Sequence, residues 1–210
     1  MNKPNRLVIA GAGAFGRELM CWADMAVGAT WGSMAWVDDD PQALDGFDYP
    51  LPWLGSFADY QPAAGDLCIV SAGTTATKQR LVAGLKARGA CFATLVHPSA
   101  IVARTAKLGE GCVICPFAFI SADAKLGEFV IVNGLSSVGH DVVLGAYSTL
   151  SAHVDLTGHV VVGEGAFFGT GAKVVPKVKI GSHAVIGAGA TVIRTVPDGA
   201  TVFTMPAKKL

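Results

Sequence analysis

An aliphatic or aromatic residue stands at every sixth position from Val96 to Val192, and this repeat restricts the possible folds more than any other feature. A small or β-branched residue follows four positions after each anchor, and glycine often follows one position after it. A helix repeats about every 3.6 residues and a strand about every 2, so neither produces this spacing. The repeat predicts a hexapeptide β-solenoid. Its anchors are Val96, Val102, Leu108, Ile114, Ile120, Leu126, Val132, Val138, Leu144, Leu150, Leu156, Val162, Phe168, Val174, Ile180, Ile186 and Val192.

Three hexads close one triangular coil of 18 residues, so each residue lies over the one 18 positions away. Successive coils stack about 4.8 Å apart, as neighbouring strands do. We expect the anchors and the small residues four places later to point inward. We expect the glycines to ease the corners, where the backbone turns tightly.

The N-terminal part of the chain has a different pattern. The short apolar run Arg6–Ala10 is followed at once by the glycine-rich stretch 11–16, and a helical pattern then runs from Arg17 to about Val27. Strand, glycine-rich turn and helix are the setting in which GxGxxG binds phosphate, because backbone N–H groups and the helix N-terminus face the anion. Without that setting, the same glycines are only a tight turn.

Two further apolar runs extend this domain. The run Met34–Val37 ends in Asp38 and Asp39, where a ribose hydroxyl is held in nucleotide-binding folds. The run 67–70 ends before Gly73, and a helix is expected over 75–88. We predict an α/β, Rossmann-like domain over residues 1–92, followed by the solenoid over 93–210. The domain has half the strands of a full dinucleotide-binding fold, which favours a nucleotide ligand other than NAD.

Composition and charge exclude several classes of partner. The formal net charge is zero, and Lys and Arg form no cluster beyond the last residues, so neither a nucleic-acid nor a membrane partner is expected. The first residues lack the apolar length of a signal peptide, so we expect a cytoplasmic protein. Cys112 and Cys115 form a CxxC, but no second pair follows, and Cys112 stands at an inward place of its hexad. Packing is therefore favoured over a metal site.

The histidines are the candidate catalytic residues. His140 is followed by Asp141, and a histidine beside a carboxylate on a rigid coil is suited to act as a general base; the alternative is a solvated ion pair. His159 lies one coil plus one residue beyond His140, so we expect it near the same edge. His153 and His183 are expected on the coil surface. His97 is expected to satisfy polar groups where the solenoid begins.

The whole chain resembles the hexapeptide-repeat sugar O- and N-acetyltransferases that carry an N-terminal nucleotide-sugar domain. The likeness is strongest to the enzymes that acetylate nucleotide-linked 4-amino-4,6-dideoxy sugars of the bacillosamine, perosamine and viosamine type, and to the sialic-acid acetyltransferases grouped with them. The segments that carry the resemblance, besides the hexads, are GAGAFGRE, VDDDP, SAGTT, HPSA, NGLSSVGHD, GAGATVIRTVPDG and MPAKK.

The resemblance implies a left-handed parallel β-helix, a homotrimer, and acetyl-CoA bound in a groove shared by two subunits, with no metal. It implies that His140 is the catalytic base and Asp141 its partner. The cofactor-binding positions that it implies are Thr149, Gly158, Thr170 and Ala188. The positions that it implies for the nucleotide-linked amino sugar are Gly13, Ala14, Phe15, Asp38, Asp39 and Gly73.

Two positions depart from the family pattern. Some members have histidine where Thr149 stands, and many have histidine or glycine where Phe15 stands. The first puts a contact from the Thr149 side chain in question, and the second suggests a differently shaped sugar or phosphate pocket. Gly158 also fits independently of the family, because it stacks one coil above His140 and presents a bare N–H suited to a thioester oxygen.

The expected reaction is acetyl transfer from acetyl-CoA to the 4-amino group of the sugar, by direct attack on the thioester. Three alternatives stay open: O-acetylation of a sugar hydroxyl, as in the sialic-acid type; a non-catalytic nucleotide-sugar-binding protein; and a zinc site between subunits, as in one carbonic anhydrase type. The zinc site needs convergent histidines. We expect the stacking by 18 residues to keep His140, His153 and His159 unaligned.

Overall fold

The computed structural model describes residues 5–26 and 31–205 and divides into two compact units, Met1–Leu95 and Val96–Leu210. The boundary expected from the sequence lies three residues earlier. Most of the tail MPAKK and the expected end of the first helix at Val27 fall outside the described residues.

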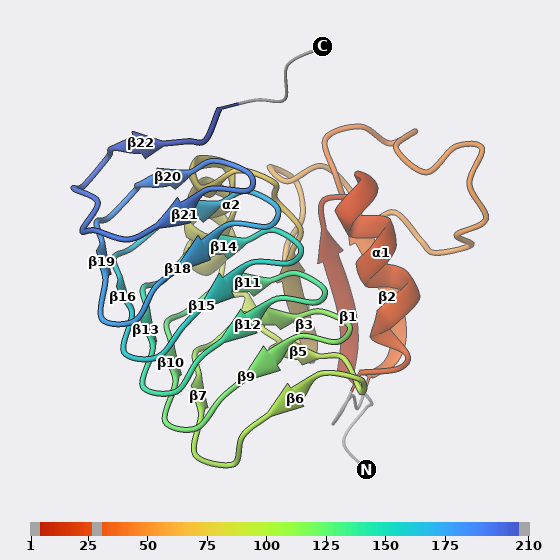
Figure 1. Ribbon diagram of the computed structural model, residues 1–210. Coiled ribbons are helices and arrows are strands. Elements are labelled where there is room, and N and C mark those ends of the chain that lie inside the picture. Colours follow the sequence, from red (N-terminus) through yellow and green to blue (C-terminus); the bar gives the residue numbers. More distant parts are fainter. Residues whose placement is uncertain (1–4, 27–30, 206–210) are drawn as a thin grey trace. The chain divides into compact units, whose positions relative to one another are not determined.

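The first unit is built on a parallel sheet with the order β2-β1-β3-β4 (Figure 1). The strands are β1 (Asn5–Ala10), β2 (Trp31–Val37), β3 (Asp66–Val70) and β4 (Cys91–Phe92), and the helices are α1 (Ala14–Ala23) and α2 (Thr75–Ala87). The apolar run of β1 is completely buried from Leu7 to Ala10, as expected for a central parallel strand. The chain crosses from one side of β1 to the other between β2 and β3, which is where such sheets bind ligands. The Rossmann-like prediction is confirmed.

Helix α1 begins three residues earlier than the sequence pattern suggested. Gly13 is its N-cap, so the last residues of the glycine motif already form the first turn. The helix ends at Ala23, with Asp24 as its C-cap. The apolar spacing beyond Ala23 therefore does not continue the helix.

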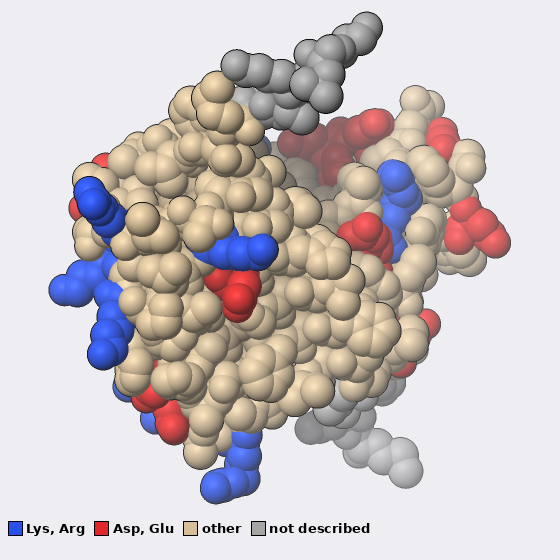
Figure 2. All heavy atoms as spheres, in the orientation of Figure 1, with Lys and Arg blue, Asp and Glu red and all other residues tan. Residues whose placement is uncertain are grey.

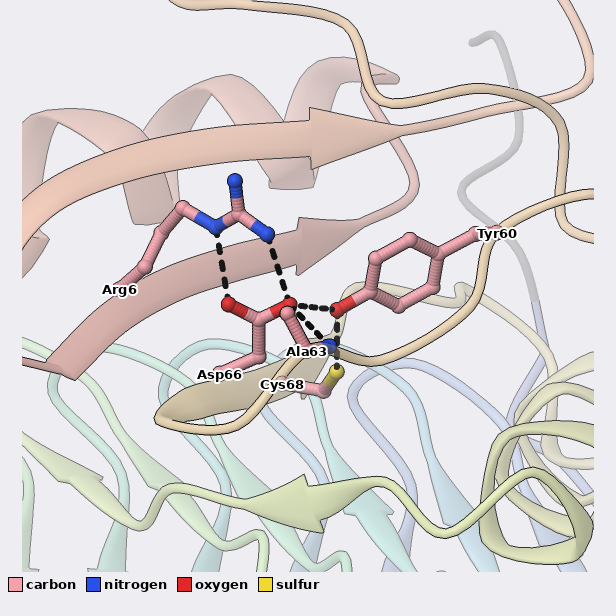
Figure 3. A network of polar contacts seen from close by, with 5 residues as sticks. All are labelled: Arg6, Tyr60, Ala63, Asp66 and Cys68. Atoms are coloured by element: carbon pink, nitrogen blue, oxygen red, sulfur yellow. Dashed lines mark hydrogen bonds and ion pairs between the residues drawn. The ribbon is translucent and has the colours of Figure 1, made fainter.

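A buried carboxylate joins distant parts of this unit at the opposite end of the strands (Figure 3). Asp66 accepts two hydrogen bonds from the Arg6 guanidinium, at 2.9 and 2.8 Å, and one from the Tyr60 hydroxyl at 2.7 Å. Burial by itself raises the pKa of Asp66, but hydrogen bonds from Arg6, the Ala63 N–H and Tyr60 outweigh it, so that the pKa lies below its ordinary value. Burial also raises the pKa of the neighbouring Cys68 thiol to about 11. The cluster ties the loop before β3 to the sheet.

The second unit is a left-handed parallel β-helix with three sheets of two-residue strands (Figure 1). The sheet orders are β19-β16-β13-β10-β7, β22-β20-β17-β14-β11-β8-β5 and β21-β18-β15-β12-β9-β6. The strands are β5 (Leu95–Val96), β6 (Ile101–Val102), β7 (Lys107–Leu108), β8 (Val113–Ile114), β9 (Phe119–Ile120), β10 (Lys125–Leu126), β11 (Ile131–Val132), β12 (Ser137–Val138), β13 (Val143–Leu144), β14 (Thr149–Leu150), β15 (Asp155–Leu156), β16 (Val161–Val162), β17 (Phe167–Phe168), β18 (Lys173–Val174), β19 (Lys179–Ile180), β20 (Val185–Ile186), β21 (Thr191–Val192) and β22 (Thr201–Val202).

Pairing between coils keeps the 18-residue register. Ile131 pairs with Thr149, and Thr149 pairs with Phe167. The anchors and the small residues four places later together form one buried core, including fully buried Val138, Val142 and Phe168. The predicted solenoid and its inward-facing residues are confirmed.

The glycines that follow the anchors serve a purpose other than the expected one. With the anchor counted as place one of a hexad, they occupy place two, and none has a positive φ. A Cβ on Gly145 would lie 2.4 Å from the backbone of Gly163, and one on Gly139 would lie 2.8 Å from the Leu156 carbonyl oxygen. Glycine is therefore required here because the next coil approaches too closely for a side chain.

The left-handed turns fall instead at place four, and most of these residues are not glycine. Asp141 and His159 have φ of 58° and 61°. From Phe129 to Gly189, the place-four N–H donates to the place-three carbonyl of the preceding coil, for instance from His159 to His140 at 3.0 Å. Phe117 and Asp123, earlier in the repeat, donate instead to the hydroxyls of Ser99 and Thr105. These bonds offset the cost of a left-handed backbone and fix the corner side chains.

Charge on the solenoid is sparse. On the face seen in Figure 2 uncharged residues cover most of the surface, and Lys and Arg lie mainly along the edge that carries β7, β10 and β19. These strands contain Lys107, Lys125 and Lys179. None of the helices in the described part of the chain has the length and apolarity to cross a membrane.

Candidate active site

His140 and Asp141 form the centre of the site, on the turn between β12 and β13. The imidazole Nδ1 lies 2.8 Å from Asp141 Oδ2, and 59% and 46% of the two side chains are exposed. The hydrogen bond from His140 lowers the pKa of Asp141 below its ordinary value. Asp141 is therefore an anion at neutral pH, and it orients the ring so that Nε2 is the nitrogen left for substrate.

Gly158 lies directly above this ring, as its place one coil later predicts. A Cβ on Gly158 would be only 2.4 Å from Nε2 of His140, so any side chain at this position would displace the imidazole. Within residues 5–26 and 31–205, the N–H of Gly158 donates no hydrogen bond. The site thus places a proton acceptor beside an available backbone donor.

His159 joins the pair from the next coil. Its ring meets that of His140 edge-on, with centroids 5.0 Å apart, and its Nδ1 lies 3.8 Å from Asp141 Oδ2. The prediction that His159 shares the edge is confirmed. The stacking was expected to leave His140, His153 and His159 unaligned. His140 and His159 nevertheless meet, because His159 lies one coil above Asp141, the residue next to His140. His153 lies on a different corner, between β14 and β15.

The remaining cofactor candidates gather at that other corner. Thr170 and Ala188 occupy place three on successive coils, between β17 and β18 and between β20 and β21, and Thr149 lies in the neighbouring strand β14. Like Gly158, Thr170 and Ala188 have N–H groups that donate no hydrogen bond within the described parts of the chain. A complete sheet, formed by β12, β15 and β18 with their neighbours, separates this corner from His140 in one chain. A single chain therefore brings Gly158 to the catalytic candidates but not Thr149, Thr170 or Ala188.

The glycine-rich loop of the first unit has the form of an anion site. Gly11 has φ of 108°, and a Cβ on Gly16 would lie 2.0 Å from the Gly11 carbonyl oxygen, so both glycines are needed for the turn and for helix packing. Gly13 has nothing within 4 Å of a Cβ position, which leaves space for a ligand. The first helical hydrogen bond runs from Arg17 to Gly13, so the N–H groups of Ala14 and Phe15 remain available.

The two aspartates after β2 accept hydrogen bonds from the loops that line this site. Asp38 accepts a hydrogen bond from the Ala12 N–H at 2.8 Å, and Asp39 accepts one from the Phe57 N–H at 3.0 Å. Both also lie at the strand end where ribose binding was predicted. Gly73 follows β3, immediately before the α2 N-cap Thr74.

Ser71 is a site residue that the sequence reasoning did not single out. Its hydroxyl donates to the Gly11 carbonyl at 2.6 Å and so joins the ends of β1 and β3. Its place in the segment SAGTT, directly after a strand, was the available signal.

Two other predictions concern residues away from the site. His97 is buried, and its Nδ1 lies 2.8 Å from the Ser99 hydroxyl at the start of the solenoid, as expected. Cys112 and Cys115 are fully buried, and the Cys112 thiol donates to the Gly127 carbonyl. Both cysteines pack in or against the core.

Known proteins with the same architecture identify the family. Residues 159–194 match the family model of the bacterial transferase hexapeptide (six repeats). The acetyltransferase domain of PglB from Neisseria gonorrhoeae FA1090, solved in complex with acetyl coenzyme A, is 31% identical; the match covers 99% of this chain and 100% of that chain, with a TM-score of 0.88. The chain belongs to the hexapeptide-repeat sugar acetyltransferases.

Other solved structures agree with this assignment. PerB from Caulobacter crescentus, in complex with CoA and GDP-perosamine, is 32% identical over 97% of this chain and 96% of that chain, with a TM-score of 0.85. WeeI from Acinetobacter baumannii AYE is 27% identical over 97% and 99% of the two chains, with a TM-score of 0.83. A comparison with curated proteins gives no significant match. This acetyltransferase therefore shares both units with its relatives.

Proposed function

We propose that this acetyltransferase transfers the acetyl group of acetyl-CoA to the 4-amino group of a nucleotide-linked 4-amino-4,6-dideoxy sugar, with His140 as general base. The observation that carries the proposal is the His140–Asp141 pair, whose Nε2 lies next to the bare α-carbon of Gly158. The similarity to PerB, solved with CoA and GDP-perosamine, supports the substrate class. Two further structures of the Caulobacter enzyme replace a histidine by asparagine or alanine, which supports the importance of a histidine in this family.

The chemistry follows from the proton balance. The sugar amine first loses its extra proton to water, and its nitrogen then attacks the thioester carbonyl, forming the N–C bond. Nε2 of His140 accepts the second proton, and the Gly158 N–H stabilises the oxyanion. The C–S bond then breaks, and CoA leaves as a thiolate that takes up a proton. No acyl-enzyme intermediate is needed.

A homotrimer completes the active site in this proposal. The catalytic residues and Thr149, Thr170 and Ala188 lie on different corners of one solenoid. A neighbouring subunit that turns its second corner toward His140 would close a groove, with backbone N–H groups on both walls for the pantetheine amides of acetyl-CoA. Rotation by a threefold axis would build three such grooves from one kind of contact.

The first unit binds the nucleotide in this proposal. The N–H groups of Ala14 and Phe15 and the positive end of α1 suit a diphosphate, and the first turn of α1 contains no acidic residue to oppose it. Asp38, Asp39 and Gly73 would line the ribose side. A nucleotide-linked sugar and acetyl-CoA are cytoplasmic metabolites, so we propose that the enzyme works in the cytoplasm.

A screen of nucleotide-linked sugars tests the function. Thiol release from acetyl-CoA would be followed with UDP-, GDP- and dTDP-linked 4-amino sugars and with sialic acid, and products identified by mass. We expect an amide product from an amino sugar. An ester product alone would replace the N-acetyl proposal with O-acetylation, and sugar binding without any transfer would indicate a binding protein.

A further inference from the structure

The corner that carries the proposed base also gathers three side chains of the kinds that bind metal ions. His140, Asp141 and His159 each present a ligand atom, and these atoms all lie within 4.8 Å of one another. Among the residues that the structure describes, no other trio of His, Cys, Asp or Glu side chains gathers in this way. We propose that these three side chains bind a zinc ion that inhibits the enzyme.

The geometry is close to that of a zinc site. Bonds of about 2.0–2.1 Å in a tetrahedron separate the ligand atoms by about 3.3 Å. Asp141 Oδ2 lies 2.8 Å from His140 Nδ1 and 3.8 Å from His159 Nδ1, on either side of this value. All three side chains are exposed, so small rotations suffice to bring them into place.

The backbone holds the three residues at one corner of the solenoid. Asp141 and His159 occupy the same place on consecutive coils, and the His159 N–H donates to the His140 carbonyl at 3.0 Å. Two imidazoles and one carboxylate form a ligand set that zinc uses with an open fourth position, whereas Mg²⁺ prefers oxygen ligands.

Nearby charges limit the affinity. Lys125 interacts electrostatically with Asp141, and Lys177 occupies the place above His159. Asp123, one coil below Asp141, has the opposite effect. We therefore expect weaker binding than that of a structural zinc site.

Binding would stop the proposed reaction through the tautomer of His140. A metal on Nδ1 leaves the remaining ring proton on Nε2, so Nε2 can no longer accept a proton from the amine. The metal also removes Asp141 from the ring. This inhibition rests on the proposed role of His140, whereas metal binding does not.

Binding is measured first, on tag-free enzyme. Equilibrium dialysis with Zn²⁺ and metal analysis gives the stoichiometry, and Co²⁺ gives an absorption spectrum that reports tetrahedral coordination. We expect one ion per chain in the wild type and at least about tenfold weaker binding in His159→Asn. The matched control is His183→Asn, which changes another exposed place-four histidine with a left-handed backbone, on the third corner between β19 and β20, and should bind as the wild type does.

Inhibition is measured second, by chromatography of the acetylated sugar, because Zn²⁺ also binds the CoA thiol. Rates with added Zn²⁺ are divided by the metal-free rate of the same variant. We expect inhibition of the wild type and of His183→Asn that EDTA reverses, weaker inhibition of His159→Asn, and none by Mg²⁺. Absence of saturable Zn²⁺ binding, or equal binding by His159→Asn and wild type, would overturn the site. Zinc bound at this site without inhibition would keep the site and contradict the proposed role of His140.

Discussion

Replacing Gly158 with alanine places a methyl group against the ring of His140, the proposed base. The new Cβ would lie 2.4 Å from His140 Nε2, and ordinary contacts begin at 3.4 Å, so the ring must move by about 1 Å. Such a movement strains or breaks the 2.8 Å hydrogen bond between Nδ1 and Asp141. A misplacement of about 1 Å costs on the order of 10²-fold in rate, so we expect kcat to fall by about that factor.

The fold should tolerate this change. Gly158 has no positive φ, and alanine occupies the same place of the hexad at Ala146, Ala152 and Ala188. The matched control is Gly134→Ala, at place three of the other corner, where the new Cβ would lie 3.2 Å from a carbonyl oxygen and far less would need to shift.

Steady-state kinetics with a nucleotide-linked amino sugar, together with thermal unfolding of each variant, measure both effects. We expect Gly134→Ala to retain nearly the wild-type rate and Gly158→Ala to lose activity without losing stability. Wild-type turnover by a folded Gly158→Ala variant would refute the placement of Nε2 at the reacting centre.

Three further predictions follow from the same geometry. Asp141→Asn should lower kcat by about 10- to 10²-fold, a part of the general-base contribution, while the dissociation constant of acetyl-CoA in calorimetry stays the same. Gly13→Ala should fold normally, because a Cβ there meets nothing within 4 Å, but should weaken nucleotide-sugar binding about tenfold in calorimetry, because the methyl group fills the space for the phosphate. Asp66→Asn should lower the free energy of unfolding at neutral pH by about 3 kcal/mol. Since the folded pKa of Asp66 is below its ordinary value of 3.8, this difference should be complete above that pH and vanish as the pH falls through the folded pKa; urea unfolding at several pH values measures it.

Much of the solenoid was predictable because the six-residue repeat, with three hexads to a coil, determines the register between coils. A residue 18 positions away lies on the next coil, so the position of Gly158 above His140 followed from counting. The purpose of the place-two glycines did not follow, because the period says nothing about how closely two coils approach. Only the coordinates show the backbone of Gly163 where a side chain on Gly145 would be.

Contacts between distant segments were beyond sequence reasoning. Arg6 and Asp66 are 60 residues apart, and neither carries a motif that would pair them. The bond from the Ala12 N–H to Asp38 likewise depends on which strand lies beside β1. The approach of His159 to Asp141 required both the coil register and the direction in which each side chain leaves its corner.

The separation of the candidate site over two corners has a related origin. The hexad repeat assigns Thr170 and Ala188 to one corner and His140 to another, but the repeat of one chain contains no information about a neighbouring subunit. The groove between subunits therefore stays a proposal.

The rate of His140→Ala in an otherwise intact enzyme tests the central claim most directly. Turnover of a nucleotide-linked 4-amino sugar would be measured beside the dissociation constant of acetyl-CoA. If His140 is the general base, turnover falls by about 10²–10⁴-fold while acetyl-CoA binding stays near the wild-type value. Turnover equal to that of the wild type would contradict the account.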